Sequence, residues 1–198
     1  LEGALGEAVH WEMDRPRPEW ALALPAQLAL LGAQVMWSEE TEGALDEAEA
    51  GVDTALGSYA EACSRRLEAL IRLVQGYLQP GERAKIITLI TMDVHNRDVV
   101  QRMVDKKVES SLDFQWLSQL RYYANHEEKG VPGEVAVRVC DYCAVYCWEY
   151  VGNCGRLVVT PLTDRCYITL TTALRLMLGG APAGPAGTGK TETTKDLA

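Results

Sequence analysis

The sequence contains no long apolar run: no stretch approaches the ~20 residues that a membrane-spanning helix needs. A basic segment followed by an apolar one, the pattern of a secretory signal, is missing from its start. The chain also has no block of Lys or Arg, and its net charge of −9 argues against a nucleic acid or an anionic membrane as a partner. These absences predict a soluble, intracellular protein that binds neither nucleic acid nor membrane.

A complete set of zinc ligands is also missing, although the chain has six cysteines. Cys140 and Cys143 form a CxxC pair, with Cys147 and Cys154 behind it, but zinc ribbons and fingers need a second pair at matched spacing. The three histidines lie far apart in the sequence, at His10, His95 and His126. We interpret the cysteines as reduced and packed, with a zinc site as the less frequent alternative, and the histidines as structural.

The chain does have enough apolar sequence for a large core, since 47% of its 198 residues are apolar. Its charge is uneven. Residues 151–198 carry five Lys or Arg and three Asp or Glu, a balance of +2, so residues 1–150 balance at −11. This predicts a boundary near residue 150, with any phosphate ligand on its basic side. The first residue is Leu1 in place of Met, which with the abrupt end predicts a piece of a longer protein.

Apolar residues at helical spacing dominate the first two thirds of the chain. One short apolar helix is expected at 25–37. A stripe at steps of three or four over residues 45–77 predicts one long helix, with a kink or break possible at Gly51 or Gly57. A further helix is expected over about 82–107. No heptad is sustained, so the pattern favours a packed helical array over a free coiled coil.

The apolar period changes from helical to two near residue 135. Alternating residues predict two short strands, at 135–139 and 142–150, and the second carries an aromatic face that we interpret as packing rather than a ligand platform. Gly152, Asn153 and Gly155 then predict a turn. This turn falls at the charge boundary, so two independent signals predict a joint at the same place.

A phosphate-binding pattern lies near the end of the chain. Gly184, Gly189, Lys190 and Thr191 satisfy G-x-x-x-x-G-K-[ST], in which glycines let the backbone wrap around phosphate oxygens at a helix N-terminus. Lys190 is expected to reach the β and γ phosphates, and the Thr191 hydroxyl to bind Mg²⁺. The predicted cofactors are therefore ATP or ADP and Mg²⁺. The predicted phosphate-binding residues are Gly184, Pro185, Ala186, Gly187, Thr188, Gly189, Lys190, Thr191 and Glu192.

The surroundings of this pattern are partly those of a nucleotide-binding fold. Residues 163–178 predict a helix with Thr163 as its cap, and TKDLA after the loop can open another helix. The strand that usually precedes such a loop would have to be GGAPA, residues 179–183, which is too rich in glycine to predict from propensity.

The run RLVVTPLTDRCYITLTTALRLMLGGAPAGPAGTGKTETTKDLA resembles the start of the first AAA+ module of a dynein heavy chain. The segments LITMDVHNRDVV, DFQWLSQLRYY and WEYVGN resemble the end of the dynein linker, so the likeness covers residues 20–198. Residues 179–198 are more similar to axonemal than to cytoplasmic dyneins. The resemblance implies a mainly α linker array with a short strand pair at 1–151, of which 1–20 are unassigned. At 152–198 it implies the truncated start of an α/β P-loop AAA+ module.

The resemblance also implies what the chain does. It would be part of a microtubule motor ATPase located in the cytoplasm, the cytoskeleton and the axoneme of cilia or flagella. Its expected partners are the rest of the heavy chain with its AAA+ ring, microtubules, and dynein intermediate and light chains. By position, the loop that covers the adenine consists of Val159, Thr160, Pro161 and Leu162, although an ordinary helix lead-in also explains Thr160 and Pro161. GGAPA is where the family places its strand.

The groups that activate water fall beyond residue 198 in the resemblance, so no catalytic residue is expected within this chain and the isolated chain is expected to be inactive. Two alternatives stay open on the residues alone. One is another P-loop ATPase with a helical leader, and the other is a non-catalytic helical interaction module.

Overall fold

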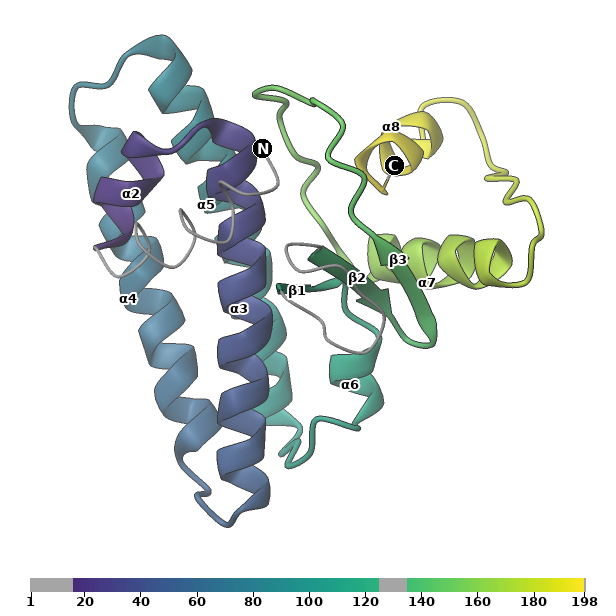
Figure 1. The fold of residues 1–198 in the computed structure, drawn as a ribbon, viewed down its shortest axis with the longest axis horizontal. Coiled ribbons are helices and arrows are strands. Elements are labelled where there is room, and N and C mark those ends of the chain that lie inside the picture. The colour runs from purple at the N-terminus through teal and green to yellow at the C-terminus, as the bar shows by residue number, and fades with distance from the viewer. Residues whose placement is uncertain (1–15, 125–134, 198) are drawn as a thin grey trace.

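Four helices in the first part of the chain pack side by side, as seen in a computed structural model that describes residues 16–124 and 135–197 (Figure 1). The helices keep the labels of Figure 1. They are α2 (Arg17–Ala23), α3 (Ala26–Glu49), α4 (Ala55–Gln75) and α5 (Pro80–Asp105). The predicted helical array is confirmed, and the helix expected at 25–37 is longer than predicted and continues to Glu49.

The single helix expected over 45–77 is wrong, because the chain turns back between α3 and α4. The break lies at Gly51, whose φ of +99° is in the left-handed region where only glycine is relaxed. The N–H of Val52 donates to the carbonyl of Glu47 and closes the end of α3. Gly57 lies within α4 and does not break it. The break that the sequence left open is therefore at the first of the two glycines.

Two apolar clusters hold the bundle together. In one, Trp37 of α3 meets Trp116 edge-on with ring centroids 5.2 Å apart, and Val100 of α5 is fully buried beside them. Trp116 belongs to a short helix, α6 (Phe114–Leu117), that follows the bundle. The other cluster centres on Trp20, Leu70 and Leu89. The apolar stripes of the sequence are thus core, and burial of large apolar side chains is the main stabilising term.

A three-stranded antiparallel sheet packs beside α3. Its strands are β1 (Arg121–Ala124), β2 (Val135–Val139) and β3 (Tyr142–Val145), in the order β1-β2-β3. The predicted strand at 135–139 is confirmed, whereas the one expected at 142–150 ends at Val145. Tyr146 and Trp148 pack instead against α3, which confirms the packing interpretation for these two residues, whereas Tyr150 is 87% exposed. Sequence reasoning missed β1, because four residues form a strand only through their pairing with β2.

The last part of the chain lies beyond the sheet from α3 and α4 (Figure 1). It consists of α7 (Pro161–Arg175), which contacts β2 and β3, and α8 (Lys190–Leu197), which contacts α7. The first turn of α7 reaches back to α5. The helix expected at 163–178 therefore begins two residues earlier and ends three residues earlier. Its N-cap is Thr160 rather than Thr163: the N–H of Thr163 donates to Thr160 Oγ1 over 3.3 Å, and the N–H of Thr160 donates to Thr163 Oγ1 over 3.3 Å.

The strand that the resemblance places at GGAPA is not formed. Residues 179–183 have no strand partner among the described residues, whose sheet is confined to β1, β2 and β3. Two glycines and a proline also give this segment little tendency to pair unaided. Gly180 runs close to α7, where an added Cβ would lie 2.4 Å from a methyl carbon of Leu170. The expected mainly α fold with short strands is confirmed, but this strand is a correction.

Within the described residues, no helix is both long and apolar enough to cross a membrane.

Candidate nucleotide-binding site

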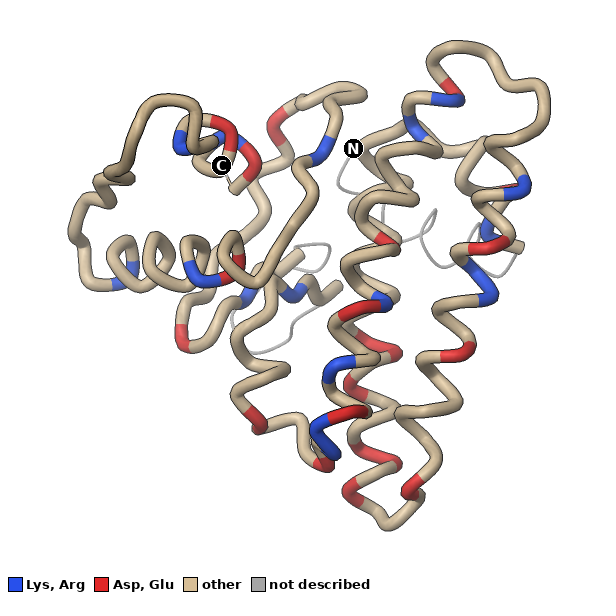
Figure 2. Tube along the Cα trace, turned by 180° about the vertical axis from the view of Figure 1, so that it is seen from behind, with Lys and Arg blue, Asp and Glu red and all other residues tan. Residues whose placement is uncertain are grey.

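The predicted phosphate loop is an exposed turn between α7 and α8. Gly187 and Gly189 both have a φ of +78°, a conformation that side chains rarely adopt. No atom lies within 4 Å of the place where a Cβ would stand at either residue, so backbone conformation and not packing explains these two glycines. Residues 181–189 are exposed throughout, and they carry no charged residue before Lys190 (Figure 2).

Lys190 begins α8 and its side chain folds back across the loop. Its ammonium donates hydrogen bonds to the carbonyls of Gly184, at 2.9 Å, and Pro185, at 2.6 Å. Thr188 Oγ1 also donates to the carbonyl of Pro185, at 2.9 Å. The cation therefore lies against the first residues of the loop, at Gly184 and Pro185. The first N–H groups of any helix lack intrahelical acceptors, so the start of α8 adds donors on the same side. These residues fit a polyphosphate.

The predicted adenine segment has two kinds of residue. Leu162 is 70% exposed and Val159 is half-buried, so apolar surface is available there. Thr160 and Pro161 instead start α7, one as its cap and the other at its first position. The side chain of Thr160 is thus occupied by capping, which favours the lead-in interpretation for these two residues. The assignment of all four to an adenine stays a prediction.

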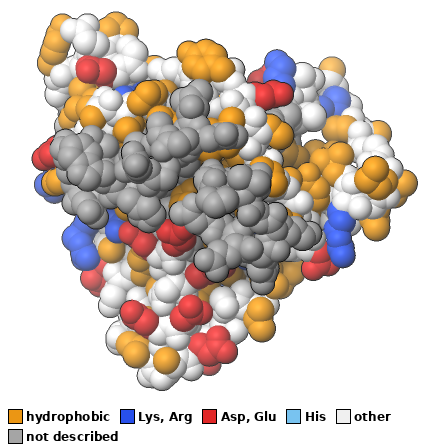
Figure 3. Space-filling model, viewed as in Figure 1, with side chains coloured by type: hydrophobic (Ala, Val, Ile, Leu, Met, Phe, Trp, Pro, Cys, Tyr) orange, Lys and Arg blue, Asp and Glu red, His pale blue; other side chains and the backbone are white. Residues whose placement is uncertain are grey.

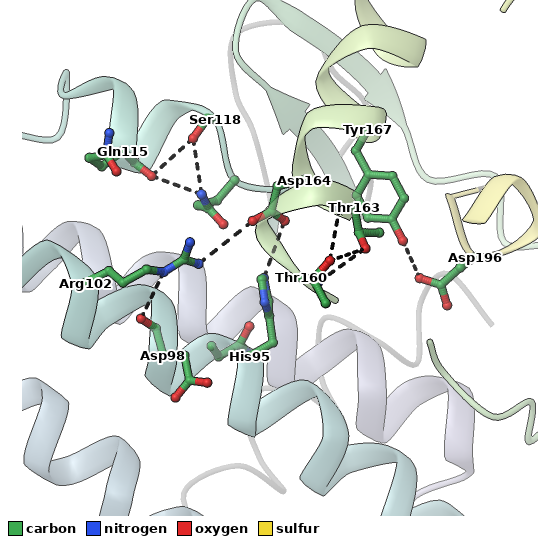
Figure 4. A network of polar contacts seen from close by, with 12 residues as sticks. His95, Asp98, Arg102, Gln115, Ser118, Thr160, Thr163, Asp164, Tyr167 and Asp196 are labelled. Atoms are coloured by element: carbon green, nitrogen blue, oxygen red, sulfur yellow. Dashed lines mark hydrogen bonds and ion pairs between the residues drawn. The ribbon is translucent and has the colours of Figure 1, made fainter. Parts of the chain in front are cut away.

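His95 and Arg102 of α5 point toward Asp164, in the first turn of α7 next to this segment (Figure 4). His95 Nε2 lies 3.9 Å from Asp164 Oδ1, and Arg102 Nη2 lies 3.9 Å from Asp164 Oδ2. The pKa of His95 is lowered to about 4, chiefly by burial and also by the positive charge of Arg102, although Asp98 opposes the shift. Burial raises the pKa of Asp164, while Arg102 opposes the shift. His95 is therefore neutral at pH 7, and Arg102 is the charge that faces Asp164.

Sequence reasoning missed three residues around the two segments: His95, Asp164 and Asp196. His95 had been interpreted as structural, and the structure adds that it faces α7. Asp196 of α8 approaches the chain just before the adenine segment, at Arg156 and Leu157. No local pattern could have identified these contacts, because 39 and 40 residues separate the partners of Asp196.

The structure gives no metal centre of its own among the described residues, where no three His, Cys, Asp or Glu side chains gather closely enough to hold an ion. All six cysteines are described and none forms a disulfide, but the interpretation of the cysteines as packed is wrong for the four that are exposed, Cys143, Cys147, Cys154 and Cys166. Thr191, the predicted Mg²⁺ ligand, is exposed in the first turn of α8.

Comparison with known families assigns a class to this region. Residues 146–198 match the family described as "Hydrolytic ATP binding site of dynein motor region". The phosphate loop and both helices around it thus lie in an ATP-binding region of the dynein AAA+ type.

The whole chain is similar to axonemal dynein heavy chains. It is 48% identical over 197 residues, 100% of its length, to "Dynein axonemal heavy chain 17" of Homo sapiens. It is 50% identical over 197 residues to "Dynein beta chain, ciliary" of Heliocidaris crassispina. It is 47% identical over 185 residues, 93% of its length, to "Dynein beta chain, flagellar outer arm" of Chlamydomonas reinhardtii. The chain belongs with the dynein heavy chains of the axonemal type, and it spans about 4% of the length of these relatives.

Proposed function

We propose that this chain supplies the phosphate-binding loop of the main ATP site, together with the end of the force-transmitting linker, in an axonemal dynein motor. The observation that carries the proposal is the loop at 184–191, in which Gly187 and Gly189 have positive φ and Lys190 folds back to the carbonyls of Gly184 and Pro185. The match of residues 146–198 to a dynein ATP-binding region supports it.

In this function the loop binds the phosphates of ATP. Lys190 would donate to β and γ phosphate oxygens in place of its two carbonyl acceptors. The backbone amides of Gly187 to Thr191 would also donate to phosphate oxygens. Thr191 is the Mg²⁺ ligand, and Glu192 follows it in the first turn of α8. When bound, Mg-ATP supplies the phosphoanhydride whose hydrolysis drives motion. No residue of this chain is assigned to the activation of water.

The chain divides into two parts in this proposal. Residues 1–151 are the end of the linker, with 1–20 unassigned, and residues 152–198 begin the first AAA+ module. The end of α7 carries apolar side chains that are each more than half exposed: Leu174, Leu176, Met177 and Leu178. This exposure supports the proposal that another part of the motor packs there. Hydrophobic side chains gather at that end of the molecule (Figure 3). The rest of the AAA+ ring is the partner that would cover them.

The parent motor would act on microtubules in the axoneme of a cilium or flagellum. The names of the relatives, which are axonemal, ciliary and flagellar, support this location. Dynein intermediate and light chains are further partners of the proposed complex.

The test is Lys190→Ala in the complete heavy chain, with Lys195→Ala as a control on the same helix. Lys195 is 69% exposed at its side chain, and its ammonium lies 3.3 Å from Oε1 of Glu192. We expect Lys190→Ala to lower ATP turnover by at least about 100-fold, because a charge that stabilises the transferring phosphate is lost. The control should turn over ATP at the unsubstituted rate. Equal turnover in both variants would contradict the proposal.

A further inference from the structure

Asp196 is the most heavily bonded side chain of α8. Its Oδ2 accepts a hydrogen bond from the hydroxyl of Tyr167 on α7 at 2.6 Å (Figure 4). Its Oδ1 accepts from the backbone N–H of Leu157 at 3.1 Å and lies 3.2 Å from Nε of Arg156, whose Nη2 donates to Oδ2 at 3.3 Å. Its side chain is only 6% exposed. One buried carboxylate therefore joins α8 to two other parts of the site.

The contacts of Asp196 connect the two halves of the proposed nucleotide site, the phosphate loop and the adenine segment. Asp196 is six residues beyond Lys190, about 9 Å along the axis of the same helix. Leu157 is two residues before the adenine segment, and Tyr167 lies on the helix that this segment opens. A shift of Asp196 moves the phosphate loop against the adenine segment, because α8 transmits it as a rigid element.

Little else fixes α8 in the described chain. The one apolar residue among its eight, Leu197, is no more than half-buried, so no fully buried apolar side chain holds α8 in place. Hydrogen bonds to a charged group are stronger than those between neutral groups, and burial strengthens them further. Burial, together with its hydrogen bond to Asp196, raises the pKa of Tyr167, so this hydroxyl stays a donor at pH 7.

We propose that Asp196 is a positioning residue that sets the distance and angle between the phosphate loop and the adenine segment. The inference rests on the proposed function and adds to it how the two halves of the site act together. ATP occupies both halves at once, so its affinity depends on how well their spacing is fixed. A ligand that occupies only the phosphate loop gains nothing from that spacing.

This difference separates positioning from a general structural role. Inorganic tripolyphosphate carries the phosphates of ATP without the base or the sugar. If Asp196 only held the loop in shape, its loss would weaken ATP and tripolyphosphate alike. If Asp196 sets the spacing, its loss weakens ATP alone. The two ligands, measured on one variant, therefore give two different patterns.

The experiment uses the complete heavy chain with Asp196→Ala, Asp196→Asn and Tyr167→Phe, and Lys195→Ala as the matched control beside Asp196. Turnover that Lys190→Ala abolishes is assigned to this site, and its KM for ATP and its inhibition constant for Mg-tripolyphosphate are measured. Asp196→Asn keeps the shape and one acceptor but loses the charge that faces Arg156. Tyr167→Phe removes a single hydroxyl from a folded helix, so it tests the proposal even if Asp196→Ala does not fold.

We expect Asp196→Ala to raise the KM for ATP about tenfold, with the inhibition constant for tripolyphosphate within about threefold of the unsubstituted value. The kcat should change less than KM, because the lost interaction is made equally in the ground state and the transition state. Asp196→Asn and Tyr167→Phe should raise KM about threefold, and Lys195→Ala should not change it.

Two results would overturn the inference. One is a parallel loss of ATP and tripolyphosphate affinity in the Asp196 variants, and the other is an unchanged KM for ATP in Tyr167→Phe and Asp196→Asn. Failure of the proposed function gives a third, distinct pattern, in which Lys190→Ala itself leaves turnover and both constants unaltered. That pattern removes the site and the inference with it.

Discussion

Nη2 of Arg102 lies 3.9 Å from Oδ2 of Asp164, so an ion pair joins α5 of the helical bundle to the first turn of α7 (Figure 4). Asp164 comes two residues after the predicted adenine segment, and its side chain is only 13% exposed. A carboxylate in this position also interacts favourably with the start of its own helix. A displacement of α5 would therefore change the position of Arg102 relative to Asp164, a partly buried charge pair next to the adenine segment.

We expect this pair to couple the two parts of the chain measurably. A double-mutant cycle with Arg102→Gln and Asp164→Asn should give a coupling free energy of about 1 kcal/mol in unfolding, because the carboxylate is shielded from water. The exposed pair of Glu61 and Arg65 on α4 is the control, with about 0.3 kcal/mol. Urea denaturation of the four proteins in each cycle provides the measurement. Equal coupling in the two cycles would show that the contact with α7 adds nothing.

His95 makes stability depend on pH. Its pKa is about 4 in the folded chain, chiefly because of burial, against an ordinary value of 6.5. The unfolded chain therefore binds a proton between these values that the folded chain does not, and stability falls as pH decreases from about 6.5 toward 4. The unsubstituted chain should lose up to about 2 kcal/mol of unfolding free energy between pH 7 and pH 5 because of His95, and His95→Gln should not show this loss.

Asp164, Asp98 and Arg102 are charged groups that face His95. The raised pKa of Asp164 has the opposite effect on the pH dependence of stability. Because the folded chain holds this proton more tightly than the unfolded chain, the contribution of Asp164 to the free energy of unfolding falls as pH rises. The quantity to compare is therefore the difference between the unsubstituted chain and His95→Gln at each pH, measured by chemical denaturation. A difference that does not change with pH would refute the prediction.

The joint between the sheet and α7 contains one conformationally demanding glycine and one ordinary glycine. Gly152 has a φ of +64°, whereas Gly155 is outside the left-handed region and an added Cβ would meet nothing within 4 Å. Gly152→Ala should destabilise the chain by about 1 kcal/mol because of backbone strain, and Gly155→Ala should leave it unchanged or slightly more stable. Thermal unfolding of the two variants decides this, and equal midpoints would count against it.

The same joint is not a free tether. Gln27 of α3 donates to the carbonyl of Glu149 at 2.7 Å and accepts from the N–H of Val151 at 3.4 Å, and Asn153 donates to the carbonyl of Gly81 at 3.1 Å. These bonds connect the joint to the bundle on both sides of Gly152. The strain introduced by an alanine therefore has no loose segment into which it can relax.

The end of α7 offers a stabilising substitution. Met177 has a φ of +57° and is 92% exposed, and the N–H of Leu178 donates to the carbonyl of Ala173 at 2.8 Å, an arrangement in which glycine is preferred. Met177→Gly should raise the free energy of unfolding by about 0.5–1 kcal/mol. Leu176→Gly is the control, because Leu176 has a φ of −83° and gains nothing there. A destabilised Met177→Gly protein in the same denaturation assay would be the contrary result.

Much of this protein follows from its sequence alone. The apolar stripes place the helices, because one buried face requires a period of three to four residues. The phosphate loop follows equally, since Gly187 and Gly189 are needed at positive φ and Lys190 must stand at the start of a helix. Both features depend on residues close together in the chain.

Features that depend on distant partners were decided only by the tertiary structure. Residues 121–124 form β1 because β2 lies beside them and pairs with them. Residues 179–183 form no strand because no described strand lies beside them to pair with. The contacts of Asp196 with Leu157, and of Arg102 with Asp164, leave no local pattern, because each joins residues tens of positions apart. A local sequence fixes backbone conformation and the face that is buried, whereas pairing of charges and strands depends on which segments the packed core brings together.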